Sequence, residues 1–420
     1  MQTYNPKQIE VVNAPEDYVS VEAPPGSGKT YVLIGAIQQY AKEHPEAHIV
    51  AITFTRKAAG ELAERIAVDN VEVSTIHSWA YRRLAVLGEE YCFPVQILEE
   101  DRVKDILKQL CVRARQYYIN QFQLYSYVMG NYNIDIDDKI KRTYEAIRYK
   151  YIKYKREYKL YDFTDLPLYL LDKLKEYHRC IDDIDAFFVD EFQDIDTTEQ
   201  ELFERVMASK KLYIGDPRQS IYAFRGSLDD AMETLSGFAH YSLVENYRSY
   251  QEIIDYATSV RNFWEELQDE GVDMHSLILH NPESYQLSYI ECERGEGGKV
   301  YTMPDIGECM DVVNWKPTNQ LSVLKSIMED PTTQILCRSN KQVKKLISLG
   351  FDNVSTVHQA KGLEYGKVIV VDFEPTNNEE MNIGYVAMTR AKNELCVVNF
   401  EVLLYHICRG VIKKRQKALF

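Results

Sequence analysis

Residues 23–30 read Ala-Pro-Pro-Gly-Ser-Gly-Lys-Thr, and this stretch decides the fold. An apolar run at 18–21 precedes it and the helical apolar spacing of 31–39 follows it, so it joins a strand to a helix. Backbone N–H groups in a glycine-rich turn at a helix N-terminus form a binding site for anions. Lys29 adds a cation for the outer phosphates and Thr30 adds a hydroxyl for magnesium, although an alanine replaces the usual first glycine. The stretch predicts a phosphate loop that binds a nucleoside triphosphate with Mg²⁺.

Two adjacent carboxylates follow another apolar run. Residues 187–189 read Phe-Phe-Val, and Asp190 and Glu191 end this expected strand. In a hydrolytic site one carboxylate holds the metal ion and another polarises the attacking water, and we assign these roles to Asp190 and Glu191 in that order. A solvated acidic strand end is the alternative interpretation, and the phosphate loop in the same chain makes it the weaker one.

Apolar runs alternate with helical patterns along most of the chain, which is typical of parallel sheets with both faces covered. The other expected strands are 48–54, 71–74, 211–214, 334–337, 368–372 and 395–399. The segment 87–160 differs, because it has helical patterns and no strand-like run. We therefore predict an α/β fold of two units with a helical insertion in the first.

Composition narrows the class of protein only slightly. The formal net charge of −15 argues mildly against nucleic acid, but a basic groove can lie on an acidic protein. The eight cysteines include no Cys-x-x-Cys pair, which argues against a zinc site or a disulfide framework and fits a reducing cytosol. No long uncharged apolar run and no secretory signal pattern is present, so we expect a cytoplasmic protein without a membrane partner.

Residues 190–194 read Asp-Glu-Phe-Gln-Asp, and together with the phosphate loop they resemble the UvrD/Rep family of superfamily 1 helicases. Further segments resemble the motifs of this family, and they occur in the family's order. They are residues 5–8, 53–59, 74–78, 162–166, 215–226, 245–249, 337–340, 356–364 and 385–391. Each one alone is weak or moderate evidence, but the ordered set is specific.

The resemblance implies two RecA-like motor domains with parallel sheets. Their expected bounds are 1–86 with 162–236 for domain 1A, 87–161 for the helical insertion 1B, and 237–420 for domain 2A. The 2B subdomain of larger relatives is expected to be absent, because the connection 341–355 is too short to hold it. The implied activity is that of an ATP-dependent DNA helicase or translocase. It would move 3′→5′ on single-stranded DNA and hydrolyse Mg-ATP in the cleft between the two domains.

The resemblance also implies roles in ATP binding and hydrolysis. Gln8 would bind the adenine edge, Tyr247 would stack on the adenine face, and Glu364 would contact the ribose. Gln219 would sense the γ-phosphate, which Arg248 and Arg390 would reach as arginine fingers. The expected catalytic residues are Lys29, Glu191, Gln219, Arg248 and Arg390, and the expected metal-binding residues are Thr30 and Asp190. The expected ATP-binding residues are Gln8, Ala23, Pro24, Pro25, Gly26, Ser27, Gly28, Lys29, Thr30, Tyr31, Tyr247 and Glu364.

Single-stranded DNA and 3′-tailed duplex DNA are the implied partners, and protein partners in replication, repair or defence stay open. The expected DNA-binding residues are Phe54, Arg56, His77, Tyr222, Phe224, Arg225, Thr356 and His358. Two positions depart from the family pattern: Tyr31 replaces an arginine that is common there, and Phe224 replaces a tryptophan.

Two alternatives remain open at this point. The basic, tyrosine-rich helix expected at 139–159 is either a DNA-contacting helix or a packed tyrosine stripe with solvated lysines on the opposite face. The whole chain is either a helicase or a DNA-stimulated ATPase that acts as a sensor or partner-loading switch without processive unwinding. A small-molecule kinase fits poorly, because it explains neither the 190–194 motif nor the two arginines.

Overall fold

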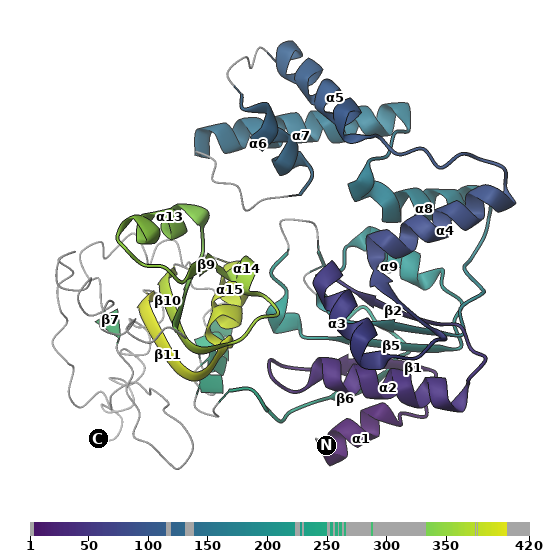
Figure 1. Ribbon diagram of the computed structural model, residues 1–420, viewed down its shortest axis with the longest axis horizontal. Helices are drawn as coiled ribbons and strands as arrows, with labels where there is room; N and C mark the ends of the chain where they lie inside the picture. Colours follow the sequence, from purple (N-terminus) through teal and green to yellow (C-terminus); the bar gives the residue numbers. More distant parts are fainter. Residues whose placement is uncertain are drawn as a thin grey trace. The chain divides into compact units, whose positions relative to one another are not determined.

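The first strand of the chain leads directly into the phosphate loop, and the sheet around it organises the N-terminal half (Figure 1). The computed structural model describes residues 4–114, 119–130, 138–222, 227–228, 231–249, 253–254, 257–258, 260–262, 264–265, 287–288, 333–373, 375 and 377–400. The chain divides into two units. The first comprises Met1–Ala23, Lys29–Pro217 and Ala223–Leu243, and the second comprises Pro24–Gly28, Arg218–Tyr222 and Val244–Phe420.

A six-stranded parallel sheet forms the centre of the first unit, in the order β3-β2-β4-β5-β1-β6. Its strands are β1 (Tyr18–Glu22), β2 (Ile49–Thr53), β3 (Val71–Thr75), β4 (Ala186–Val189), β5 (Lys210–Gly215) and β6 (Ala239–Ser242). The first five confirm the predicted strands. The prediction missed β6, because its short Ala-His-Tyr-Ser sequence is only partly buried at the edge of the sheet.

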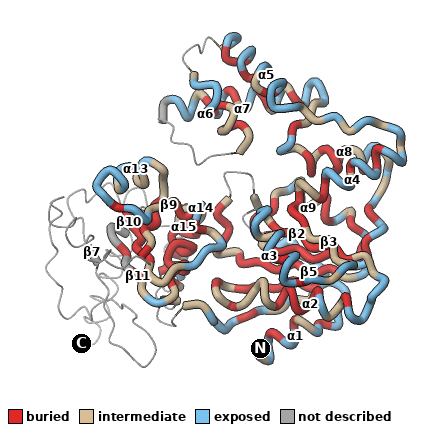
Figure 2. The backbone as a smooth tube through the Cα atoms, viewed as in Figure 1, coloured by how far each residue is buried: buried red, intermediate tan, exposed pale blue. Residues whose placement is uncertain are grey.

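Helices cover both faces of this sheet because its strands are apolar on both sides. In β2, Val50 and Ile52 face one hydrophobic cluster whereas Ile49 and Ala51 face another. The second of these clusters packs under α2 (Lys29–Glu43) and α3 (Arg56–Ile66), with α1 (Pro6–Val12) beside them. The first packs under α4 (Ile76–Glu90), α8 (Leu166–Glu176) and α9 (Thr197–Glu204). Figure 2 shows the strands buried between these two layers.

Three helices between α4 and α8 have a hydrophobic cluster of their own, which fits the predicted helical insertion. They are α5 (Glu100–Arg113), α6 (Gln121–Val128) and α7 (Asp138–Tyr158). The buried hydrophobic residues of α7 are Tyr144, Ile147 and Tyr151, at helical spacing. The packed-stripe interpretation of this helix is therefore confirmed for these residues, whereas Tyr158 is exposed. The predicted domain bounds themselves remain predictions.

The second unit contains a sheet in the order β7-β11-β10-β8-β9. Its strands are β7 (Leu287–Ser288), β8 (Thr333–Cys337), β9 (Val354–Thr356), β10 (Tyr365–Phe373) and β11 (Ala391–Phe400). The β8, β9, β10 and β11 pairings are parallel and β7 is antiparallel to β11. The predicted strands at 334–337, 368–372 and 395–399 are confirmed, and the three-residue β9 was too short for an apolar pattern to reveal.

The described helices of this unit also lie against two clusters. The clusters pack with α13 (Asn340–Ser348) on one side and with α14 (Val357–Ala360) and α15 (Asn378–Met388) on the other. Two covered sheets, the first parallel and the second parallel except for β7, confirm the predicted α/β class. Across the part of the chain that the structure describes, no helix is long and apolar enough to cross a membrane.

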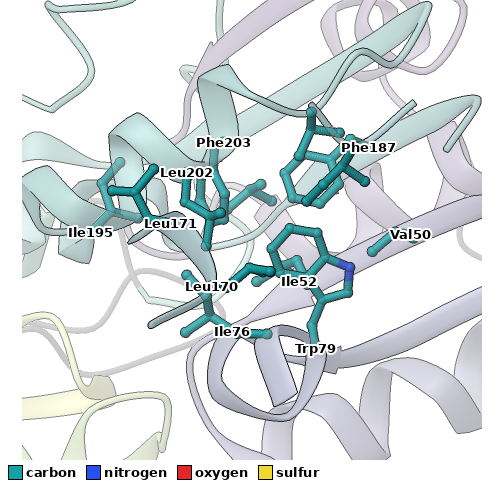
Figure 3. Close-up of a cluster of buried hydrophobic side chains, with 14 of the residues drawn as sticks. Val50, Ile52, Ile76, Trp79, Leu170, Leu171, Phe187, Ile195, Leu202 and Phe203 are labelled. Carbon is teal, nitrogen blue, oxygen red and sulfur yellow. The ribbon is translucent and has the colours of Figure 1, made fainter. Parts of the chain in front are cut away.

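Trp79 on α4 is the largest side chain that the first unit buries completely, and Figure 3 shows it against Phe187 and its neighbours. Its ring centroid lies 5.5 Å from that of Phe187. Replacement by alanine leaves a cavity in this cluster, so Trp79→Ala should lower the free energy of unfolding by about 3–5 kcal/mol. Urea denaturation followed by circular dichroism measures this loss. Tyr81→Ala on the same helix is the control, because Tyr81 is half-exposed and its loss should cost much less. Equal losses in the two variants would contradict the assigned core.

Candidate nucleotide and nucleic-acid sites

The phosphate loop joins β1 to α2, as predicted. Gly26 and Gly28 have φ angles of 74° and 83°, in the left-handed region that glycine adopts without strain. Within the loop, the Ser27 hydroxyl donates a hydrogen bond to the carbonyl of Pro24 at 2.8 Å. The loop therefore has the backbone conformation for which its glycines are needed.

Lys29 and Glu191 form an ion pair at 3.1 Å in the first unit. Burial opposes the charge of Lys29, but the carboxylates of Glu191, Asp216 and Asp190 outweigh it and raise the pKa of this ammonium. Lys29 is therefore a permanent cation at the start of α2, as the binding of phosphate requires. The structure brings together the lysine and the two acids that the sequence assigned to one site.

Gln193 orients Glu191, a role that the sequence analysis did not assign. Its Nε2 donates to the Glu191 carboxylate at 2.6 Å, and its Oε1 accepts from the Asp216 backbone N–H at 2.9 Å. Gln193 is 1% exposed, so this amide is fixed inside the protein. Gln193 lies inside the Asp-Glu-Phe-Gln-Asp motif, which was the signal available in the sequence.

The backbone of Glu191 also fixes its side chain. Its φ of 55° and ψ of 42° lie in the left-handed region, which costs a non-glycine residue about 1–2 kcal/mol. Such strain persists where the surrounding structure imposes it, and it is concentrated at functional sites. Glu191 thus leaves the strand in a sharp turn that aims its carboxylate at Lys29.

Asp190 is the predicted metal-binding carboxylate, and it is 8% exposed. Burial and the neighbouring charge of Glu191 raise the pKa of Asp190 to about 7. A bound cation would favour the ionised form of this carboxyl group. No group of three or more His, Cys, Asp or Glu side chains that could hold a metal by itself occurs among the described residues. The Thr30 hydroxyl and one carboxylate still fit Mg²⁺, because this ion is commonly held by few protein ligands together with phosphate oxygens and water.

The residues expected around the base have several contacts in the first unit. Gln8 is 3% exposed and forms a capping box with Asn5, whose backbone N–H donates to the Gln8 amide oxygen at 3.1 Å. The ring of Tyr31 stacks on that of Tyr4, with 4.4 Å between their centroids. The contacts of Gln8 and Tyr31 with adenine stay predictions.

Arg248 in the second unit pairs with Glu364, the residue expected at the ribose. The Arg248 Nε lies 2.9 Å from the Glu364 carboxylate, which also contacts Lys392. The Nη1 of Arg248 is buried without a hydrogen-bond partner among the described residues. Tyr247 is 57% exposed, and its backbone N–H donates to the carbonyl of Gly26 at 2.7 Å. Burying an unpartnered guanidinium nitrogen is costly, which makes Arg248 a candidate for binding an anion.

Arg390 and Gln219, both in the second unit, contact each other directly. The Arg390 Nη2 donates to the Gln219 amide oxygen at 3.0 Å, and its Nε donates to the carbonyl of Val386 at 3.0 Å. Arg390 is 2% exposed and Gln219 is 5% exposed. Two of the three residues assigned to the γ-phosphate are therefore neighbours, and Arg390 is held in one orientation.

A cavity of about 1390 Å³ in the first unit is lined by the predicted DNA-binding residues Phe54 and His77. Phe163, which the sequence analysis did not single out, lines the same cavity. Its ring stacks on that of His77, with centroids 5.6 Å apart and planes 18° apart, and 47% of the residue is exposed. The motif around Phe163 was recognised, but a single phenylalanine in it gave no sign of facing a cavity.

Both basic and acidic side chains line this cavity. Helix α7 and the residue after it contribute Arg148, Arg156 and Lys159, and the acidic residues include Asp194, Asp196 and Glu199. One face of α7 packs in the helical insertion while some of its cations line the cavity, and contact of this helix with DNA stays a prediction.

The remaining DNA-binding candidates are divided between the units. In the first unit, Arg56 is exposed at the start of α3. In the second, the ring centroids of Tyr222 and His358 are 5.9 Å apart. The Lys361 ammonium lies over the Tyr222 ring, 4.7 Å from its centroid. Thr356 is buried and caps α14, a structural role beside the predicted one. The last two candidates, Phe224 and Arg225, lie outside the described residues.

Comparisons with known proteins show the family to which the chain is similar. The family model of the UvrD/REP helicase N-terminal domain matches residues 4–240, and that of the UvrD-like helicase C-terminal domain matches residues 353–398. A probable DNA helicase of Mycoplasma pneumoniae is 24% identical over 456 residues, which cover 96% of this chain and 84% of that protein. The Gabija protein GajB of Bacillus cereus is 23% identical over 498 residues, which cover 90% of this chain and 92% of GajB.

Other relatives are much longer than this chain. A probable DNA helicase II homolog of Mycoplasma capricolum is 26% identical over 308 residues, which cover 61% of this chain. The match spans only 40% of that relative. Similarity to such proteins therefore concerns a part of their length.

The geometry around Glu191 generates a prediction about hydrolysis. Glu191→Gln keeps the shape of the side chain but removes the charge that polarises water, so ATP hydrolysis should fall about 10²–10⁴-fold. Release of inorganic phosphate measures the rate, and a fluorescent ATP analogue checks that binding is retained. Glu201→Gln removes a charge from the partly exposed surface of α9 and should hydrolyse ATP at the normal rate. A Glu191→Gln variant with an unchanged rate would refute the assigned role.

Proposed function

Because the chain belongs to the UvrD/REP helicase family, we propose that it is an ATP-dependent DNA helicase or translocase that moves 3′→5′ on single-stranded DNA. UvrD-like helicases use ATP, and the proteins similar to this chain include several that are named as DNA helicases. The observation that carries the proposal is the contact of Glu191 with both Lys29 and the buried Gln193 beside the phosphate loop. The direction of movement follows from the family resemblance alone.

The residues of the first unit support a mechanism for the hydrolytic step. An incoming triphosphate would attract the Lys29 ammonium, which now pairs with Glu191, and would free that carboxylate to accept a hydrogen bond from water. Gln193 would keep the carboxylate oriented while its charged partner changes. Thr30 and Asp190 would hold Mg²⁺, which neutralises charge on the phosphates when bound.

The residues of the second unit support the binding of a charged group. We assign Arg248 and Arg390 to the charge that develops on the γ-phosphate, and Gln219 to sensing it. Gln219 contacts Arg390 through its side chain and Lys361 through its backbone carbonyl, which accepts from the Lys361 ammonium at 3.0 Å. Lys361 in turn lies over Tyr222, a predicted DNA-binding residue. This series of contacts would allow the nucleotide and the DNA to influence each other.

In the first unit we assign single-stranded DNA to the cavity lined by Phe54, His77 and Phe163. Stacking of bases on aromatic rings tolerates any sequence, as a motor that moves along DNA requires. Arg148, Arg156 and Lys159 supply cations for the phosphates along the same cavity.

One observation favours the alternative of a DNA-stimulated ATPase that acts as a sensor or loading switch. Helix α13 and strand β9 lie within residues 340–356, so they occupy the connection at which larger relatives carry the 2B subdomain. Protein partners in replication, repair or defence, and a cytoplasmic location, remain proposals of the same kind.

Strand displacement distinguishes the helicase from the switch. We expect the protein to separate a 3′-tailed duplex in the presence of Mg-ATP and to leave a 5′-tailed duplex intact. Lys29→Ala and Glu191→Gln should abolish displacement, because both remove the hydrolytic step. DNA-stimulated hydrolysis without displacement would support the switch, and displacement of only the 5′-tailed duplex would refute the direction.

The aromatic lining of the cavity generates a second prediction. Phe163→Ala should weaken the binding of a fluorescent oligothymidine about tenfold, since base–aromatic stacking contributes roughly 1–3 kcal/mol per base. Fluorescence anisotropy measures the affinity. Phe122→Ala is the matched control, because Phe122 is 74% exposed on α6 and does not line the cavity. Equal affinities of the two variants for the oligonucleotide would exclude Phe163 from the DNA site.

A further inference from the structure

A buried lysine joins helix α7 to the turn that carries Phe163. Lys155 is 5% exposed, and its ammonium lies 2.7 Å from the carboxylate of Asp162 and 2.5 Å from that of Asp165. Tyr151, one turn earlier on α7, donates its hydroxyl hydrogen to Asp162 at 2.9 Å. Two residues of the helical insertion therefore hold the short helix η1 (Phe163–Asp165) through the carboxylates of Asp165 and of its N-cap residue, Asp162.

The same two carboxylates fix the backbone on both sides of Phe163. Asp162 accepts hydrogen bonds from the backbone N–H and the hydroxyl of Thr164, at 2.8 and 2.6 Å. Asp165 accepts from the backbone N–H of Asp162 at 2.8 Å. This capping box sets the conformation of η1 and thus the direction of the Phe163 ring.

The carboxylates need a cation in order to stay in this arrangement. Burial disfavours the charge on Asp162, but the Lys155 ammonium and several hydrogen bonds lower its pKa. Burial and the charge of Asp162 raise the pKa of Asp165, so the two acids compete for one lysine. Without Lys155, two carboxylates in a largely buried site would repel each other, and η1 would lose the geometry that they impose.

We propose that Lys155 is a positioning residue for DNA binding: it holds η1 so that the Phe163 ring remains stacked on His77 and faces the cavity. The contact also connects Phe163 to α7, whose Tyr151, Lys155 and Arg156 line the same cavity. The inference rests on the proposed function, since it concerns the DNA-binding residues of that site.

A purely structural role for Lys155 is the competing explanation. The helical insertion already has an apolar cluster, to which α7 contributes Tyr144, Ile147 and Tyr151. Buried ion pairs often add little to stability compared with apolar residues of similar size. A lysine bound to the turn beside Phe163 is therefore better explained by the position of that ring than by the folding of the helix.

A double-mutant cycle tests the proposal through the affinity for fluorescent oligothymidine. Lys155→Met keeps the length of the side chain and removes its charge, and we expect about tenfold weaker binding, similar to Phe163→Ala. In a Phe163→Ala background, Lys155→Met should weaken binding of the oligonucleotide less than about twofold. Both changes act on the same stacking surface, the Phe163 ring, so their effects should not add. Lys153→Met removes the same charge from an exposed position of α7 and should bind normally.

Each outcome supports or overturns the inference. If Lys155→Met lowers the affinity equally in the wild-type and the Phe163→Ala proteins, the lysine acts independently of Phe163. If Lys155→Met leaves the affinity unchanged, the lysine plays no part in DNA binding. Either result overturns the inference while the wild-type protein still binds DNA. Absence of binding by the wild type would instead refute the proposed function, and the inference with it.

Tyr151→Phe keeps the proposal testable if Lys155→Met disturbs folding. It removes one hydroxyl from the contact with Asp162 and preserves the buried ring. We expect about two- to threefold weaker binding of the oligonucleotide, and no loss in the Phe163→Ala background. Thermal denaturation of each variant separates lost affinity from lost stability. An unchanged affinity in a folded Tyr151→Phe variant would contradict the assigned contact.

Discussion

Parallel pairing of β1 with β5, and of β5 with β4, brings the carboxyl ends of three strands to one edge of the first sheet. Glu22 at the end of β1 is paired with Gly215 at the end of β5, and Val189 on β4 is paired with Tyr213. The residues that follow these ends are the phosphate loop, the two acids at 190–191 and Asp216. Lys29 therefore meets Glu191 and Asp216 because of strand register, although the chain separates them by more than a hundred residues.

Local chemistry made the centre of this site predictable. A glycine-rich turn after a strand and two acids after another strand each require particular residues at adjacent positions, so spacing alone reveals them. The orientation of Glu191 could not be predicted in this way. It depends on Gln193, whose amide accepts a hydrogen bond from the backbone N–H of Asp216, the residue after the neighbouring strand β5. It also depends on a left-handed backbone turn at Glu191, which no single residue type indicates.

Helix α7 likewise shows what could not be predicted from the sequence. Its apolar spacing correctly indicated a packed stripe, but every lysine on it looked like part of a solvated face. Lys155 is buried because its partners, Asp162 and Asp165, come from the turn after the helix. Phe163 was likewise indistinguishable from a core residue until the cavity beside His77 was visible. The positions of Lys155 and Phe163 therefore depend on contacts between elements rather than on sequence patterns within them.

The left-handed backbone at Glu191 places folding stability and activity in opposition at one position. A glycine there would adopt the same φ without the steric cost and would favour the folded state, yet it would supply no carboxylate. Selection for thermal robustness alone would therefore change this residue, whereas selection for turnover would keep it. In engineering terms, a substitution that stabilises the fold at position 191 would remove the carboxylate from the site.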